Sequence, residues 1–333
     1  MRINHTLPVA ILIALLSFSV EGVKIVRVLS QNVKFILAAG DPSIRAPVIV
    51  ERLLAKDPLY DIIAFQEVFS TKADYLGMTL LVEGLAAVYP FHVKLQPNPI
   101  PRSKFYDSGL LIVSRYPIEL VEFHEYGSSS GLDALSSKGM MIAAVNVTSS
   151  EDNSEQLPKL VFGNTHLQAG AEATRLKQIS EASDAFKRAI ASIPESINAV
   201  VLAAGDFNVN EQDQESYNFL MDTLSDQTRD LFREVAEESV VGATLGSRRI
   251  DYVFGLDKIS GERMRGSYKV LEAGVDDFAM DGDLTDHKGA YAIIELSNET
   301  IIEDDEKASS AFQVVPISIF FLFSCITLLA FVF

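Results

Sequence analysis

Five groups of polar residues in this chain stand directly at the ends of apolar runs. They are Asn32, Gln66–Glu67, His166, Asp206-Phe207-Asn208 and Asp286-His287. Core strands end in loops, where reactive side chains can reach a substrate. Carboxylates, amides and imidazoles are the groups that hold a divalent cation or hydrogen-bond a phosphate. Each group alone also suits a turn, a helix cap or a buried histidine, but five together indicate a site that handles a metal and a phosphate.

These groups must be positioned by the apolar runs that precede them, together with the amphipathic stretches between those runs. Strands are expected over 23–31, 61–68, 108–114, 118–126, 140–147, 160–166, 199–204, 249–254, 268–273 and 289–296. Helices are expected over 46–56, 70–89 (capped by Ser70), 171–192 and 213–224. The strands and helices neither alternate strictly nor segregate, which favours a large sheet or a pair of sheets covered by helices.

Charge and cysteine content narrow the class of protein. The formal net charge is −17, and so acidic a body repels polyanions and weighs against a protein that holds long nucleic acid through phosphate contacts. Acidic residues are also the ligands of a hard divalent cation. The single cysteine, Cys325, lies near the C-terminus, so the body of the chain has neither a disulfide nor thiol chemistry.

The two ends of the chain predict export and attachment to a membrane. Residues 1–22 combine a basic start, an apolar run and small residues, as in a secretory signal peptide. We expect residues 23–297 to form one catalytic domain and residues 298–313 to form an acidic stalk. The apolar tail 314–333 favours a glycosylphosphatidylinositol signal, with a single membrane span as the alternative. We therefore expect the protein to be secreted or held on the extracellular face of the plasma membrane, with glycans at the Asn146 and Asn298 sequons.

Six short motifs occur in an order that resembles the endonuclease/exonuclease/phosphatase superfamily. They are Ser30-Gln31-Asn32, Phe65-Gln66-Glu67, Gly163-Asn164-Thr165-His166, Gly205-Asp206-Phe207-Asn208, Arg249-Ile250-Asp251-Tyr252 and Thr285-Asp286-His287. The resemblance covers the chain from about residue 25 to 296. It implies a four-layer α/β sandwich, with two mixed β-sheets face to face and helices outside, and an active site at one edge.

The same resemblance implies a metal centre. Glu67, with help from Asn32, would hold Mg²⁺, and Asp286 would complete the metal or water network. Magnesium prefers oxygen ligands and keeps several waters, so one or two carboxylates suffice. Mn²⁺ accepts the same ligands, and the sequence does not choose between the two ions.

The resemblance also implies catalytic roles for five residues. Asp206 would take a proton from the attacking water, and Asn208 would hydrogen-bond the phosphoryl oxygens. His166 and His287 would contact the phosphate, and one of them would protonate the leaving alkoxide. Asp251 would orient His287, because a carboxylate partner fixes the tautomer of a histidine.

Two further segments resemble the neutral sphingomyelinase branch of this superfamily. Residues 106–118 are similar to a segment of that branch. Asp133 and Lys138, five residues apart before a glycine, resemble its paired aspartate and lysine, which implies that Lys138 approaches the metal site with Asp133 as its partner. The alternative is a surface turn with an incidental ion pair.

The resemblance therefore implies hydrolysis of sphingomyelin, or of a related choline phospholipid, to ceramide and phosphocholine. A tethered enzyme would meet membrane lipid at high effective concentration. Choline is often recognised by aromatic faces, and Phe105, Tyr106 and Tyr126 lie near the motifs. Two alternatives stay open: a secreted DNase-type endonuclease with the same catalytic residues, and a non-enzymatic cell-surface binding protein.

Overall fold

The structure is a computed structural model. It describes residues 23–36, 39–70, 76–95, 104–148, 157–194, 198–280 and 284–297. The predicted signal peptide, acidic stalk and apolar tail lie outside these described residues. Within them, the helices are too short or too polar to span a bilayer.

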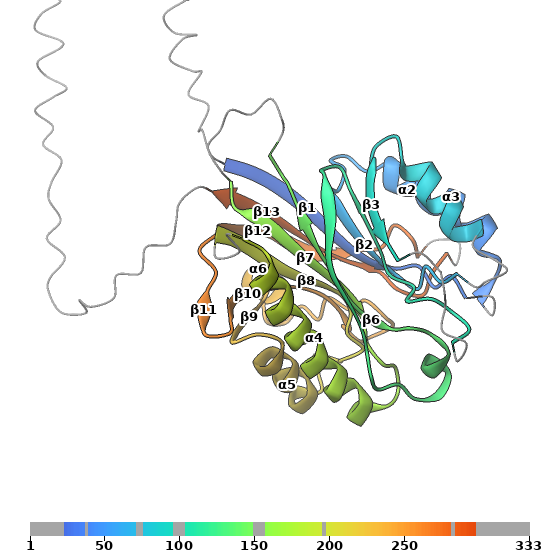
Figure 1. Cartoon of the computed structure of the whole chain (residues 1–333). Helices are drawn as coiled ribbons and strands as arrows, with labels where there is room; N and C mark the ends of the chain where they lie inside the picture. The colour runs from blue at the N-terminus through green and yellow to red at the C-terminus, as the bar shows by residue number, and fades with distance from the viewer. Residues whose placement is uncertain are drawn as a thin grey trace, which may run out of the picture. The chain divides into compact units, whose positions relative to one another are not determined.

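The first sheet has six strands in the order β12-β13-β1-β2-β4-β3. Their bounds are β1 Val23–Asn32, β2 Ile62–Gln66, β3 Phe91–Lys94, β4 Leu111–Ser114, β12 Ser267–Asp276 and β13 Gly289–Ser297. Strands β1 and β2 run parallel, and the other neighbours are antiparallel. The first and last strands of the described chain, β1 and β13, thus lie side by side (Figure 1).

The second sheet contains seven strands, with β11-β10-β8-β7-β6-β5 in order and β9 paired to β10. Their bounds are β5 Ile118–Glu125, β6 Gly139–Val145, β7 Lys159–His166, β8 Ala199–Asp206, β9 Gln227–Asp230, β10 Asp251–Ile259 and β11 Glu262–Arg263. Strands β7 and β8 form its parallel pair. Each sheet therefore has one parallel pair near its centre, and both sheets are mixed.

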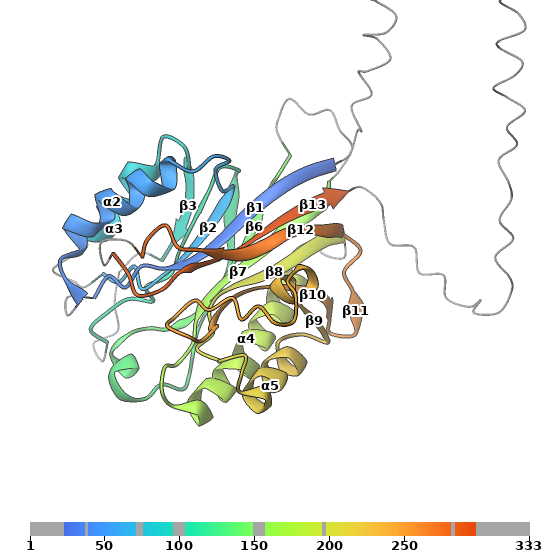
Figure 2. The same ribbon diagram turned by 180° about the vertical axis from the view of Figure 1, so that it is seen from behind.

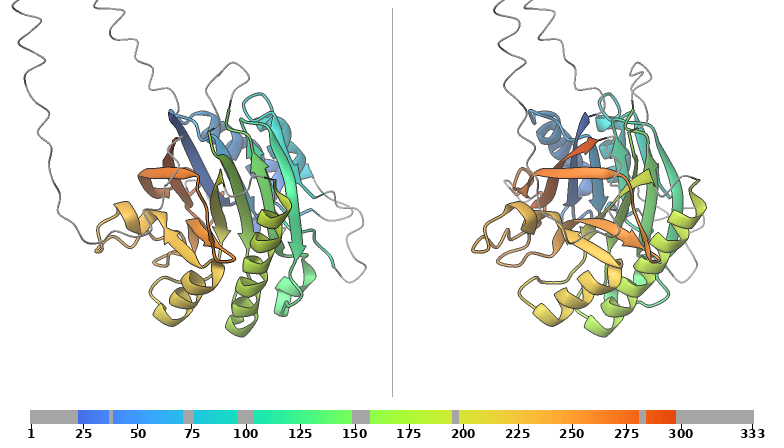
Figure 3. Two further views of the ribbon diagram at one scale, coloured as in Figure 1. Left: turned by 60° about the vertical axis from the view of Figure 1, so that its left-hand side comes forward. Right: turned by 90° about the vertical axis from the view of Figure 1, so that its left-hand side faces the viewer.

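Helices cover the outer face of each sheet. Helices α2 (Pro42–Leu54) and α3 (Leu76–Leu85) lie over the first sheet, and α4 (Glu172–Ser192) and α5 (Gln214–Leu224) over the second (Figures 1 and 2). A short helix α6 (Leu231–Val235) and a 3₁₀ turn η2 (Gly131–Leu135) complete the helical elements of the described chain. The views in Figure 3 show the two sheets face to face with the helices outside. The expected four-layer sandwich is confirmed.

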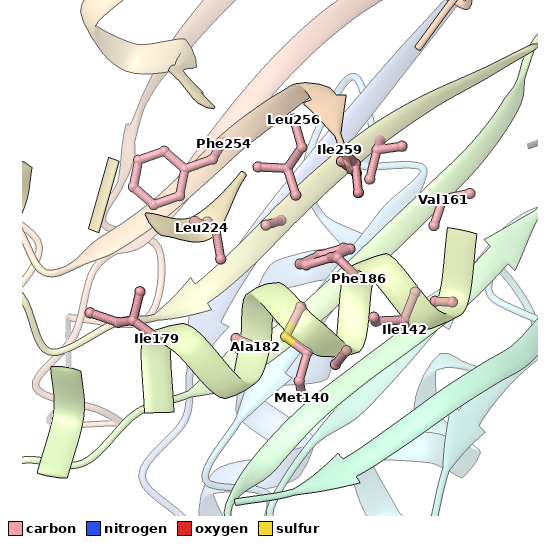
Figure 4. Packing of buried hydrophobic residues seen from close by; sticks show 14 of the residues in the cluster. Met140, Ile142, Val161, Ile179, Ala182, Phe186, Leu224, Phe254, Leu256 and Ile259 are labelled. Atoms are coloured by element: carbon pink, nitrogen blue, oxygen red, sulfur yellow. The ribbon is translucent and has the colours of Figure 1, made fainter. Parts of the chain in front are cut away.

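Three apolar cores separate these four layers. Strand β8 shows why: Val200 and Leu202 pack between the sheets, while Val201 and Ala203 face α4 and α5. Successive side chains of a strand point to opposite faces, so a strand buried on both faces must be apolar throughout. Figure 4 shows the core beneath α4, where Phe186 packs among side chains from β6, β7 and β10.

Some sequence-based boundaries were wrong. Helix α2 begins at Pro42, before the expected residue 46, because the Asp41 side chain accepts a hydrogen bond from Ser43 N and caps it. Ser70 was expected to cap the next helix, but its backbone nitrogen donates to Asp107 and its hydroxyl accepts from Lys94. The short strands β3, β9 and β11 were missed, since four residues or fewer carry little periodicity.

Candidate active site

The polar strand ends converge at one edge of the sandwich. In the parallel pair β1–β2, Asn32 lies opposite Gln66, and in the parallel pair β7–β8, His166 lies opposite Asp206. Asp251, the first residue of β10, is also paired with Asp206 across an antiparallel ladder. The carboxyl ends of parallel strands meet at one edge, so the topology places these groups together without any long loop.

Asn32 joins two carboxylates at the centre of this edge. Its Nδ2 donates to Glu67 Oε1 at 2.9 Å and to Asp206 Oδ2 at 3.1 Å. Its Oδ1 accepts from the backbone nitrogen of Lys34 at 3.0 Å. Glu67 has a φ of 56°, and this left-handed backbone turns its side chain into the site. In this arrangement Asn32 positions the carboxylates through its amide nitrogen, and its expected part in metal binding stays a prediction.

Glu67, His166 and Asp206 form a group that fits a divalent cation. One ligand atom from each lies within 4.8 Å of the others. Burial, and then the Asp251 carboxylate, raise the pKa of Asp206 to about 7. Crowded buried carboxylates favour a bound cation, which would relieve their mutual repulsion. The donor set therefore suits Mg²⁺ or Mn²⁺.

His287 is held by Asp251. Its Nδ1 lies 3.0 and 3.2 Å from the two carboxylate oxygens of Asp251, and its Nε2 lies 3.8 Å from Asp206 Oδ2. Burial disfavours the imidazolium, but the Asp251 and Asp206 carboxylates outweigh it and raise the pKa of His287 to about 10. The expected orientation of His287 by Asp251 is present, and the two carboxylates favour the protonated form of His287 at neutral pH.

His166 is held by a cation instead. Lys138 Nζ lies 3.1 Å from His166 Nε2, 3.0 Å from the Leu167 carbonyl oxygen and 3.0 Å from Asp133 Oδ1. Burial, then the charges of Lys138 and His287, lower the pKa of His166 well below its usual value. The expected Asp133–Lys138 pair is therefore formed, and Lys138 reaches the catalytic edge, buried to 3% exposure.

Asn208 completes the edge. Its φ is 52°, its backbone nitrogen donates to Asp206 Oδ1, and its Nδ2 donates to the Leu167 carbonyl oxygen at 3.0 Å. An amide nitrogen carries two hydrogens, so one remains for a phosphoryl oxygen. The role expected for Asn208 is compatible with this geometry.

Comparison with known proteins identifies the family. The model of the Endonuclease/Exonuclease/phosphatase family matches residues 29–255. The chain belongs to this family. It is similar to a sphingomyelinase of Dictyostelium discoideum, 25% identical over 201 residues, which cover 52% of this chain and 44% of that protein. It is also similar to human sphingomyelin phosphodiesterase 3, 32% identical over 112 residues, covering 32% and 17%. The match to each relative thus spans less than half of that relative's length.

Three solved structures share the fold. Beta toxin from Staphylococcus aureus with bound magnesium ions aligns with a TM-score of 0.58 at 20% identity, covering 81% of this chain and 99% of that one. Sphingomyelinase C from Streptomyces griseocarneus aligns with a TM-score of 0.58 at 17% identity, covering 83% and 100%. Danio rerio TDP2 complexed with a single-strand DNA product gives 0.56 at 17%, covering 81% and 99%. At these identities the similarity shows the fold.

The family's Asp-His motif has an unexpected partner in this chain. Lys34 Nζ lies 2.6 Å from Asp286 Oδ2, and Asp286 belongs to neither metal-capable group of the described residues. Its other oxygen, Oδ1, lies 4.0 Å from His287 Nε2. The expected part of Asp286 in a metal network stays a prediction. Lys34 was not expected at the site, and its position two residues after Asn32 was the only signal in the sequence.

Two carboxylates that were not predicted from the sequence, Asp230 and Glu211, bind Arg249 beside the site. Arg249 donates to both oxygens of Asp230, at 3.0 and 2.6 Å, and to Glu211 at 3.0 Å. This buried guanidinium ties the loop after Asn208 to the start of β10, where Asp251 stands. Arg249 belongs to one of the six motifs, but its partners Asp230 and Glu211 are distant in sequence.

Proposed function

We propose that the chain is a Mg²⁺-dependent phosphodiesterase of the sphingomyelinase C type, which hydrolyses sphingomyelin or a related choline phospholipid to ceramide and phosphocholine. The observation that carries the proposal is a geometry: His166 and His287 lie 3.6 and 3.8 Å from Asp206 Oδ2, one contacting Lys138 and the other Asp251. The similarity to sphingomyelinases and the contact of Lys138 with His166 support the lipid substrate. The family alone does not choose the substrate.

The reaction follows from the charges of the site. Asp206 takes a proton from the water whose oxygen attacks the phosphorus atom, and its pKa, raised to about 7, suits it as a base near neutral pH. The bond between phosphorus and the ceramide oxygen breaks. His287, cationic at neutral pH, donates its Nε2 proton to the departing alkoxide. Asn208 and Lys138 stabilise charge on the phosphoryl oxygens.

Glu67 is the residue that would hold the metal, with the Asp206 carboxylate beside it. When bound, Mg²⁺ would supply positive charge that stabilises the transition state. The magnesium ions in the structure of beta toxin support this choice of ion. Asn32 keeps Glu67 and Asp206 apart at a fixed spacing through its two hydrogen bonds.

The proposal is tested by release of phosphocholine from labelled sphingomyelin in detergent micelles, with and without EDTA. We expect release that EDTA stops and added Mg²⁺ restores. Plasmid DNA in a parallel assay tests the endonuclease alternative, which the fold of TDP2 with its DNA product keeps open. Cleavage of DNA alone would overturn the lipid assignment, although a net charge of −17 argues against a DNA groove. Hydrolysis of neither substrate would favour the non-enzymatic binding protein.

We also propose that the protein is exported, glycosylated and tethered. The apolar ends of the sequence support the first and last of these features. At the sequon, Asn146 is exposed, and its Oδ1 accepts hydrogen bonds from Thr148 Oγ1 at 2.5 Å and from Thr148 N at 3.2 Å. Glycosidase treatment of protein from a eukaryotic host, with Asn146→Gln as the comparison, tests the glycan. Release from cells by a phosphatidylinositol-specific phospholipase tests the anchor.

A further inference from the structure

Three exposed apolar side chains gather beside the candidate active site. They are Phe105, Leu132 and Leu135, with exposed fractions of 55%, 86% and 43%, and we name them the apolar rim. Leu132 and Leu135 belong to η2, the short green turn at the lower right of Figure 1. The Phe105 backbone nitrogen donates to the Leu135 carbonyl oxygen at 2.7 Å, so the two segments are joined.

The apolar rim is continuous with the site along two routes. On one side Phe105 packs edge-on against Tyr106 at 4.8 Å between ring centroids, and Tyr106 lies 5.3 Å from Phe69, two residues after Glu67. On the other side η2 contains Asp133, the partner of Lys138. The apolar rim thus adjoins the segments that carry Glu67 and Lys138.

The surface of η2 carries no outward charge. Asp133 is the only charged residue between 126 and 137 in a chain with a net charge of −17. Its carboxylate is turned inward: Oδ1 pairs with Lys138, and Oδ2 accepts from Ala169 N at 2.8 Å and from Gln168 Nε2 at 2.7 Å. The exposed side chains of η2 therefore include Leu132 and Leu135, while the contacts of Asp133 hold the turn against the rest of the protein.

We propose that the apolar rim inserts into the surface of a zwitterionic phospholipid bilayer and sets the active site at the lipid headgroups. The proposal rests on the proposed function, because it assumes that the substrate is itself a membrane lipid. A stable protein partner buries about 800 Å² on each side, which three side chains do not approach. Binding to a bilayer surface scales with the apolar area that is buried, and Lys104, the residue before Phe105, is paired with Glu125 at 3.9 Å. The acidic chain excludes attraction to anionic lipid as the driving force.

Fluorescence tests the contact without any activity measurement. The chain contains no Trp, so Leu132→Trp introduces a single reporter. We expect its emission to shift to the blue and rise in intensity with phosphatidylcholine and sphingomyelin vesicles. Ile44→Trp is the matched control, since Ile44 is an apolar residue of α2 with an exposed fraction of 69%. An unchanged spectrum of the Leu132→Trp variant, or equal shifts in both variants, would overturn the proposal.

Kinetics separates this proposal from the proposed function. We expect the double variant Leu132→Ser/Leu135→Ser to lose about 10-fold or more of its activity on sphingomyelin vesicles. It should retain its activity on a water-soluble choline phosphodiester, and Ile44→Ser should retain both. Equal losses on vesicles and on the soluble ester would overturn the apolar rim as a membrane contact. If the unmodified protein cleaves neither substrate, the proposed function fails, and the Leu132→Trp emission still decides the membrane contact.

Discussion

His166 and His287 are both buried, and both lie within 4 Å of the same oxygen, Asp206 Oδ2, yet their charges differ. His287 faces the Asp251 carboxylate, which raises its pKa to about 10. At His166, burial and then the neighbouring Lys138 ammonium lower the pKa well below the usual value. Burial disfavours the imidazolium in both cases and is the largest cause at His166, whereas at His287 the carboxylates outweigh it. The pair shows how the surroundings give two residues of one type opposite pKa shifts within a single site.

The largest expected effect is on the protonated side of this comparison. His287→Ala removes the proton donor, and Asp251→Asn removes the charge that keeps it protonated. We expect kcat on micellar sphingomyelin to fall by about 10³-fold or more for the first and by about 10²-fold for the second. The measurement is steady-state release of phosphocholine, with His92→Gln, an exposed histidine of β3, as the control. Unchanged turnover in His287→Ala would contradict the assignment of the acid.

For the neutral histidine, His166, we expect a smaller loss of kcat. Lys138→Met removes the cation next to His166 and charge near the phosphoryl group, so we expect kcat to fall by about 10- to 100-fold. Lys138→Arg should retain a larger share, because it keeps the charge. In proton NMR titrations the pKa of His166 should rise in Lys138→Met, because the repulsive charge is lost. An unmoved titration would mean that burial alone keeps His166 neutral.

Residues that end a strand could be predicted from the sequence, whereas contacts between loops distant in the sequence could not. Glu67, His166 and Asp206 were predicted because each ends an apolar strand, and parallel pairing brings such ends together. The contacts of Lys34 with Asp286 and of Arg249 with Asp230 could not be predicted, since they join loops whose paths no local pattern defines. The fold followed from the motifs, whereas η2 and the short edge strands are fixed by tertiary packing that the sequence does not display.

The Asp206 carboxylate, whose Oδ2 lies near both histidines, should make the free energy of unfolding depend on bound metal. In EDTA, Asp206→Asn should stabilise the protein by roughly 1–3 kcal/mol near pH 8, because a buried carboxylate with a raised pKa opposes folding once ionised. Mg²⁺ at about 100 times its Kd should stabilise the unmodified protein by roughly 2.7 kcal/mol, and Glu67→Gln by much less. Thermal unfolding with and without Mg²⁺ measures both effects. Equal stabilisation by Mg²⁺ of the unmodified protein, Asp206→Asn and Glu67→Gln would contradict the metal site.

The smallest expected effect is on the pH dependence of the free energy of unfolding, which should differ between variants of the two histidines. The folded-state pKa of His287 is raised from 6.5 to about 10, so its contribution is complete below pH 6.5 and is lost as the pH rises through 10. For His166 the folded-state pKa is lowered, so its contribution is complete above pH 6.5 and is lost as the pH falls. Denaturant unfolding in EDTA should therefore show the cost of His287→Gln shrinking as the pH rises from 7 to 10. The cost of His166→Gln should shrink in the opposite direction, between pH 7 and 5, and parallel pH dependences in the two variants would mean that Asp251 and Lys138 do not set the two charges.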